Sequence, residues 1–427
     1  MGQGVLTPGF HRVDGALSCE GVPLTALALA AGTPAYVYAS ATIRAQYARL
    51  TGALVDIPHR VHYACKANGN LAILSLLKSL GCGIDVVSGG ELHRARMAGF
   101  EPEQIIFGGV GKSATEIGQA LDTGVHLLSL ESSEELELVN RLAGERGVKA
   151  RIGLRVNPEI TVESIHDYIK TGQKGDKFGI PYDQASIVAL RAASLPHIAL
   201  VAIGMHIGSQ LTELAAYGAG LARLEALVGD IRARGVSTLE YVDVGGGLFV
   251  PYADEPPVDL TAYASLIGPV VERLRLILVV EPGRFLVAEA GALLTRVLYR
   301  KRSGGRMLLV TDAGMNDLLR PSHYQAYHRI EAVDAVARRQ SFDVVGPICE
   351  SGDFLAINRE LEDVQPGALL CVFTTGAYGF CMSSNYNARP RAAELLVDGD
   401  RWGVISAREG YEDLVRLETT TPTWRTM

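Results

Sequence analysis

The feature that most constrains this chain is a strand–helix alternation that repeats from residue 60 to residue 284. Short β-branched runs alternate with helix-compatible stretches rich in Ala, Leu, Glu and Arg, and Gly, Ser or Asn breaks separate them. The runs with strand character are RVHYACK, GIDVVS, QIIFGG, HLLSLE, ARIGLRV, IALVAIGMHI, LEYVDVGGG and LILVVEPGR. This α/β pattern predicts a (β/α)8 TIM-like barrel, because such barrels need about 250 residues, and an open doubly wound sheet stays the alternative.

A second domain is predicted where the alternation stops. After Arg284, short strand runs such as GRMLLVTDAG and GALLCVFTTGAYGF are separated by Gly, Pro and Asp turns with little helix between them. The N-terminal stretch, with GALSCEGVP as a hairpin, also lacks the alternation and can join them. The predicted domains are a barrel at 37–283 and a discontinuous, mainly β domain of sandwich or barrel-like type at 1–36 plus 284–427.

Composition narrows the classes of partner and compartment. The 427 residues are 48% hydrophobic and carry a formal net charge of −7, which argues against nucleic-acid and anionic-membrane partners. We find no apolar run of about 18 residues and no secretory pattern at the N-terminus, so we expect a cytoplasmic protein. The six cysteines form no C-x-x-C pair, and we expect reduced thiols, mostly in the core, with no metal site.

Chemically active residues gather at the predicted strand ends. In a (β/α)8 barrel these ends face one shared cavity. Taken alone, Lys66 would be expected to point into water and His206 to be an ordinary half-buried residue. Together they form a selective set, which comprises Lys66, Ser88, Gly108, Gly109, Glu131, Asn157, His206, Gly245, Gly246, Gly247, Glu281 and Arg284.

One ligand class would satisfy these residues at once. Lys66 could form an imine with an aldehyde, and three consecutive glycines after the seventh strand could hold a phosphate with backbone N–H groups. His206 could lie against a ring face, while Glu281, which follows five apolar residues, could pair with a protonated ring nitrogen. The residues therefore predict pyridoxal 5′-phosphate as the cofactor.

With these residues in place, the chain resembles the diaminopimelate decarboxylases, of the alanine racemase and ornithine decarboxylase superfamily of fold-type III enzymes. The matching segments include YACKANGN, DVVSGGEL, FGGVGKS, HIGSQ, DVGGGL, EPGR, DAGMNDLLRPSHYQAYH, CESGD and GAYGFCMSSNYNARPRAAE, in the family's order and spacing. The resemblance implies that meso-2,6-diaminopimelate is decarboxylated to L-lysine and CO2, the last step of lysine biosynthesis.

The same resemblance implies specific roles. The catalytic residues would be Lys66 and Cys349, either of which could return the proton to the substrate carbon. The cofactor would be bound by Lys66, Asp85, His206, Ser209, Gly245, Gly246, Gly247, Glu281, Gly283, Arg284 and Tyr378. The distal end of the amino-acid substrate would be bound by Arg284, Arg320, Tyr324, Glu350 and Tyr378, with the arginines on its carboxylate.

The resemblance further implies a homodimer with active sites shared across the interface, where Cys349 and Glu350 serve the other subunit. It also leaves alternatives. A relative with the same core could act on another substrate, such as a D-amino acid, a carrier-linked glutamate or a carboxy-polyamine. A non-enzymatic cofactor-binding barrel would lack the β domain that carries Cys349. A mobile loop near the cavity is expected at IHDYIKTGQKGDKFGI.

Overall fold

The protein is described here by a computed structural model that covers residues 8–160 and 175–425. The chain divides into two compact units, one of Thr42–Ala288 and one of Met1–Ala41 with Glu289–Met427. These boundaries lie further along the chain than the predicted 37–283 and 1–36 plus 284–427. The reason is that β4 (Ala35–Ala39) pairs with β14 (Gly291–Ser303) and β20 (Ala393–Asp398) of the second unit. Most of the expected loop around residues 165–180 lies outside the described residues.

In the described part of the first unit, eight parallel strands close into a barrel. They are β5 (His59–Ala64), β6 (Gly83–Val86), β7 (Ile105–Phe107), β8 (Leu127–Leu130), β9 (Ala150–Asn157), β11 (Ile198–Gly204), β12 (Tyr241–Asp243) and β13 (Ile277–Val280). The ring is completed where β13 pairs with β5 and β8 pairs with β9. The predicted TIM-like barrel is confirmed, and the open sheet is excluded because it would leave those edges unpaired.

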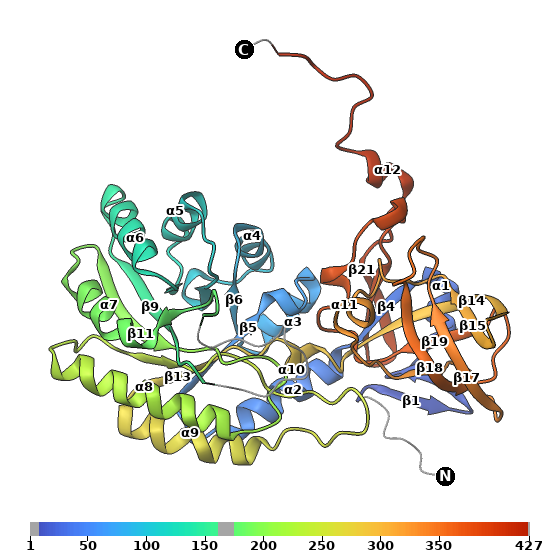
Figure 1. Ribbon diagram of the computed structural model, residues 1–427, viewed down its shortest axis with the longest axis horizontal. Coiled ribbons are helices and arrows are strands. Elements are labelled where there is room, and N and C mark those ends of the chain that lie inside the picture. Colours follow the sequence, from blue (N-terminus) through green and yellow to red (C-terminus); the bar gives the residue numbers. More distant parts are fainter. Residues whose placement is uncertain (1–7, 161–174, 426–427) are drawn as a thin grey trace. The chain divides into compact units, whose positions relative to one another are not determined.

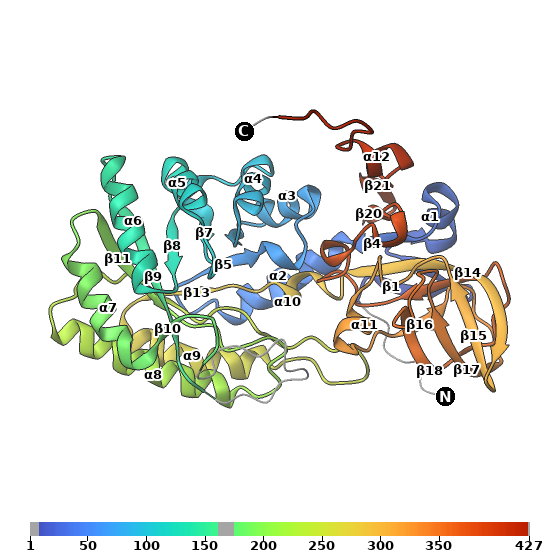
Figure 2. The same ribbon diagram turned by 45° about the horizontal axis from the view of Figure 1, so that its top comes forward.

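Helices cover the outside of the barrel, as Figures 1 and 2 show for α3 to α9. Their bounds are α2 (Ser40–Ala53), α3 (Leu71–Ser79), α4 (Gly89–Met97), α5 (Ala114–Thr123), α6 (Ser133–Glu145), α7 (Tyr182–Ser194), α8 (Ala215–Ala233), α9 (Leu260–Leu274) and α10 (Arg284–Val287). The short strand β10 (Ile180–Pro181) pairs with the end of β9 in parallel. No helix in the described ranges has both the length and the apolar content needed to cross a bilayer.

The polar breaks seen in the sequence are helix caps. The side chains of Ser88, Ser113 and Ser132 accept hydrogen bonds from backbone N–H groups in the first turns of α4, α5 and α6. At the other end of α5, Gly124 adopts a left-handed conformation with φ of 73°, which glycine tolerates without strain. Each cap satisfies backbone groups that a helix end leaves without partners, so the serine breaks in the sequence mark the starts of α4, α5 and α6.

The second unit is mainly β. Its strands are β1 (Phe10–Val13), β2 (Ala16–Cys19), β3 (Val22–Pro23), β4, β14, β15 (Arg306–Thr311), β16 (Ile330–Ala332), β17 (Arg339–Val345), β18 (Phe354–Glu362), β19 (Leu369–Val372), β20 and β21 (Arg401–Ser406). The larger sheet runs β18-β17-β15-β14-β4-β20-β21, with β19 also on β14. The predicted hairpin is the antiparallel pair β2–β3. The helices are α1 (Leu24–Ala31), α11 (Arg320–Tyr324) and α12 (Tyr411–Val415).

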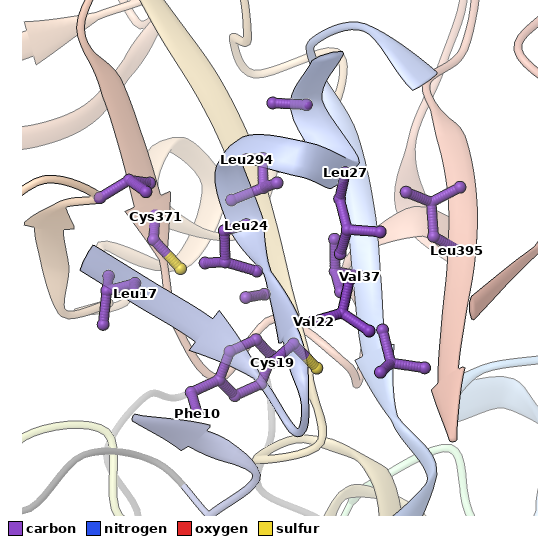
Figure 3. Close-up of a cluster of buried hydrophobic side chains, with 14 of the residues drawn as sticks. Phe10, Leu17, Cys19, Val22, Leu24, Leu27, Val37, Leu294, Cys371 and Leu395 are labelled. Atoms are coloured by element: carbon purple, nitrogen blue, oxygen red, sulfur yellow. The ribbon is translucent and has the colours of Figure 1, made fainter. Parts of the chain in front are cut away.

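Segments far apart in the sequence share the hydrophobic core of this unit. Figure 3 shows Leu24 of α1 beside Leu294 of β14 and Cys371 of β19. Phe10 meets Phe373 edge to face, with ring centroids 5.8 Å apart. The six cysteines are free thiols, and four of them are buried, as the sequence predicts; the exposed ones are Cys349 and Cys381. The N-terminal segment therefore belongs to this core.

A histidine is buried inside the barrel wall. His62 lies on β5 and is 2% exposed, and among the described residues its Nδ1 has no hydrogen-bond partner. Burial, with the nearby His126 and Arg60 as further causes, lowers the pKa of His62 to about 3. The unfolded chain would protonate this ring near its ordinary pKa of about 6.5. The unfolded state therefore binds more protons between those two values, and folding stability is lost as the pH falls through that window.

We predict that His62→Gln flattens the acid side of the stability–pH curve. At pH 5 the neutral histidine costs about 2 kcal/mol of folding free energy, and glutamine does not carry this cost. Urea unfolding at pH 7.5 and pH 5 measures the difference, with His93→Gln on the exposed face of α4 as the control. An unchanged loss of stability between the two pH values would contradict a buried neutral His62.

Candidate active site at the barrel mouth

Lys66 stands at the carboxyl end of the first barrel strand. After β5 the chain enters a short 3-10 turn, Cys65–Ala67, and the Lys66 side chain is 42% exposed. Its Nζ lies 3.8 Å from Oδ2 of the buried Asp85 on β6. The turn ends where Asn70 caps α3, accepting a hydrogen bond from Ala72 N at 2.9 Å. The lysine is therefore held at the mouth of the barrel beside a carboxylate.

Three carboxyl groups gather beside Lys66. Asp85, Asp243 and Glu281 come from β6, β12 and the end of β13. Burial raises the pKa of Asp243 to about 7 and holds the pKa of Asp85 and of Glu281 well above the ordinary range. Their mutual repulsion adds to the burial effect, while Lys66 opposes it at Asp85 and Glu281. The cluster thus favours a cationic ligand.

The three glycines form a tight turn packed on all sides by backbone and ring atoms. Gly245 has φ of 68° and Gly247 has φ of 101°, conformations that L side chains rarely adopt. A Cβ at Gly246 would collide with the carbonyl oxygen of Glu281, and one at Gly247 would lie 2.5 Å from the carbonyl oxygen of Gly208. These positions therefore require glycine, and the turn packs its backbone against Glu281, His206 and Gly208.

His206 is neutral in this site. Its Nδ1 accepts a hydrogen bond from Gly246 N at 3.2 Å, so the proton of the neutral ring sits on Nε2. Burial, with Arg155 and Lys66 as further causes, places the pKa of His206 well below its ordinary value. A neutral imidazole suits contact with a flat ring face better than a cation that has been desolvated.

An arginine and two hydroxyl groups line the side of the site near the glycine turn. Arg284 Nη1 donates to the Tyr252 hydroxyl at 2.7 Å, and its Nη2 donates to Ser209 Oγ at 3.2 Å. Leu211 N donates to Gly247 O at 3.0 Å, which ties the Ser209 loop to the glycines. This group offers a guanidinium and hydroxyl donors, the chemistry that a phosphate binds.

The structure also brings in residues that sequence reasoning missed. Asp243 and Arg155 lie inside the strand runs LEYVDVGGG and ARIGLRV, and a charged residue near the carboxyl end of an apolar strand was the available signal. Arg155 Nη1 bonds to Oε1 of the buried Glu131 at 3.1 Å, and Glu131 Oε2 accepts from Gly179 N at 2.9 Å. Ser88, placed among the strand-end residues, is the N-cap of α4.

Gly283 packs against the lysine turn, since a Cβ there would lie 3.1 Å from the Cβ atoms of Ala64 and Ala67. With it, the barrel unit brings together ten of the residues expected in the site. They are Lys66, Asp85, His206, Ser209, Gly245, Gly246, Gly247, Glu281, Gly283 and Arg284.

The remaining expected residues belong to the β unit. Arg320 at the start of α11 is buried and donates to His328 Nε2 at 2.8 Å, while His328 Nδ1 donates to Phe373 O at 2.8 Å. Tyr324 is at the end of the same helix and packs against the His323 ring, with centroids 4.5 Å apart. Arg320 is therefore oriented by a buried histidine.

Cys349 and Glu350 lie on an exposed loop of the β unit. Cys349 N donates to Asn387 Oδ1 at 2.7 Å. The Tyr386 hydroxyl is hydrogen-bonded to Glu350, which raises the pKa of that tyrosine. Tyr378 has φ of 55°, a strained conformation for an aromatic residue. Backbone strain at Tyr378 and the exposed loop of Cys349 and Glu350 are each features typical of functional segments.

Comparisons with known proteins agree with this geometry. Residues 40–288 match the family described as "Pyridoxal-dependent decarboxylase, pyridoxal binding domain". A diaminopimelate decarboxylase of Pseudomonas aeruginosa is 47% identical over 97% of this chain and 99% of its own, and one of Vibrio cholerae is 44% identical over 96% and 99%. The Helicobacter pylori diaminopimelate decarboxylase structure with L-lysine is 40% identical, with a TM-score of 0.89, covering 92% of this chain and 99% of that one.

We predict that Gly246→Ala destabilises the barrel unit by about 1–3 kcal/mol, because the added methyl meets the Glu281 backbone, which cannot rotate away. Gly111→Ala is the matched control, since nothing lies within 4 Å of a Cβ there. Thermal unfolding followed by circular dichroism measures both variants. Equal unfolding temperatures for the two would contradict the tight packing of the turn.

Proposed function

This chain belongs to the diaminopimelate decarboxylases of the pyridoxal-dependent decarboxylase family, and on that premise we propose how its residues perform the reaction. The protein decarboxylates meso-2,6-diaminopimelate to L-lysine and CO2. The observation that carries the assignment of its site is the meeting of Lys66, His206 and Glu281, which are far apart in the sequence, around the mouth of one barrel.

The described residues fit pyridoxal 5′-phosphate. Lys66 offers an amine at the cavity, and the turn at Gly245–Gly247 with Ser209 and Arg284 offers donors for a phosphate. Glu281 lies in a carboxyl cluster that favours a cation, which a protonated ring nitrogen would supply. When bound, this cofactor supplies an aldehyde that joins the substrate amine and an aromatic ring that accepts the electrons left by CO2.

The protein's own groups prepare that chemistry. The Glu281 carboxylate would attract a protonated ring nitrogen. An uncharged His206 would not repel that positive charge. Asp85, 3.8 Å from Lys66, holds the lysine amine at the cavity, where it can take up or return a proton. Glu281 would thus keep the ring nitrogen protonated to draw in the electrons left by CO2, so this stabilisation would be greatest in the transition state.

We propose that the β unit supplies substrate recognition and a proton. Arg320, Tyr324 and Tyr378 would bind the distal carboxylate together with Arg284, and Glu350 would bind the distal ammonium. Support comes from the buried His328 that orients Arg320, since a fixed guanidinium pairs with a carboxylate at two points. A substrate without the distal carboxylate would offer this guanidinium no anion, which disfavours lysine and ornithine. Cys349 or Lys66 would return the proton.

We predict that the purified protein, loaded with pyridoxal 5′-phosphate, converts meso-diaminopimelate to L-lysine and CO2, measured by chromatography of the amino acid. Lys66→Ala should lose the absorption band of the bound cofactor near about 420 nm and retain below about a thousandth of the activity. Lysine formation at the wild-type rate by Lys66→Ala would contradict the role of that residue. Turnover of a D-amino acid or a carboxy-polyamine instead would identify the alternative function.

We further propose a homodimer in which Cys349 and Glu350 act at the partner's site, and a cytoplasmic location. The exposure of Cys349, with its backbone fixed by Asn387, supports this proposal because an exposed anchored thiol is available to another subunit.

A subunit-mixing experiment tests the shared site. If Cys349 returns the proton, Lys66→Ala and Cys349→Ala should each be nearly inactive, and half of the dimers that form on random mixing carry one variant of each kind. Such a dimer has one intact site, so the mixture should regain about a quarter of wild-type activity. The control is a mixture of Lys66→Ala with Lys66→Ala,Cys349→Ala, which has no intact site. Activity no higher than this control would contradict the sharing.

A further inference from the structure

Asp243 is hydrogen-bonded both to the glycine turn and to Glu281. It is the last residue of β12, and its Oδ1 accepts a hydrogen bond from Gly245 N at 2.7 Å. Its carboxyl group is also hydrogen-bonded to the carboxyl of Glu281. On the neighbouring strand, Gly204 is its register partner, and a Cβ there would lie 2.8 Å from Cβ of Asp243. The barrel therefore makes room for this side chain through a glycine.

The charges around the pair favour the retention of one proton. Asp85, Arg155 and Tyr263 face Asp243, while Lys66 and Arg155 face Glu281. Both cations already have carboxylate partners, because Lys66 lies 3.8 Å from Asp85 and Arg155 lies 3.1 Å from Glu131. Two carboxylates in contact, one buried and one half-buried, repel each other, so they favour holding a proton between them.

We propose that Asp243 is a positioning residue that holds Glu281 in a singly protonated carboxyl pair and takes over the proton when a cationic ring nitrogen lies against Glu281. The proton leaves an Oε of Glu281 and joins an Oδ of Asp243, so none enters or leaves the pair. Asp243 then donates its hydrogen bond to a Glu281 carboxylate. The identity of the cation rests on the proposed function.

This arrangement matches the pair's charge to its ligand. With one proton retained, the pair carries a single negative charge against a single positive charge. Because Asp243 also binds Gly245 N–H, the same side chain aligns Glu281 with the glycine turn. The backbone reinforces that link, since Glu281 N donates to Gly245 O at 2.8 Å.

The test is infrared spectroscopy of the protein loaded with pyridoxal 5′-phosphate. The difference spectrum between wild type and Asp243→Asn should show a lost carboxylic-acid C=O band, because the amide that replaces the carboxyl group has no proton of that kind. Glu131→Gln is the control, since Glu131 is a buried carboxylate paired with Arg155, and it should keep the band. A band that survives in Asp243→Asn, or is lost in Glu131→Gln, overturns the proposal.

Cofactor affinity gives a second readout. The amide of Asp243→Asn can accept from Gly245 N and donate to Glu281, so its Kd for pyridoxal 5′-phosphate should stay within about threefold of wild type. Asp243→Ala loses both bonds and should bind about ten- to a hundredfold more weakly. Equal weakening in both variants overturns the proposal. If the infrared difference is as expected but no lysine is formed, only the substrate assignment is overturned. If the wild type binds no pyridoxal 5′-phosphate, both the proposed function and the role of Asp243 are overturned.

Discussion

Closure of the parallel sheet is the constraint on which the active site depends. Pairing of β13 with β5 and of β8 with β9 brings the first and last strands of the repeat together, although more than two hundred residues separate Lys66 from Glu281. Because the strands are all parallel, every carboxyl end faces the same side. A site made of one lysine, one histidine and several carboxyls follows from this geometry without any local sequence motif that contains them all.

The electrostatics of the mouth follow from burial. Removing Asp85, Asp243 and Glu281 from water raises their pKa values, and repulsion among them adds to the effect. Burial lowers the pKa of His206, because the charged form of a histidine is its protonated form. A site with several buried acids and an uncharged imidazole is organised for a ligand that brings positive charge. The pyridoxal chemistry of the family and the charge balance of this protein therefore agree.

The β unit combines a hydrophobic core with an exposed loop that carries Cys349. Its N-terminal hairpin, α1 and strands from the last third of the chain share one buried cluster, which explains why the unit is discontinuous in sequence. Against that core, Arg320 is oriented by His328, whereas Cys349 and Glu350 lie on an exposed loop. The unit thus carries a buried, hydrogen-bonded arginine on one segment and an exposed cysteine on another.

The amino-acid sequence by itself determined the eight strands, the glycine turn and the roles proposed for Lys66, His206 and Glu281. These features have local causes: β-branched runs, serine and glycine caps, and the position of polar residues directly after apolar strands. Only the tertiary structure decided that β4 belongs to the β unit, that Asp243 bonds to Glu281, and that Arg155 is committed to Glu131. Those facts depend on which strands become neighbours and on how much water their side chains lose, and neither can be read from spacing along one chain.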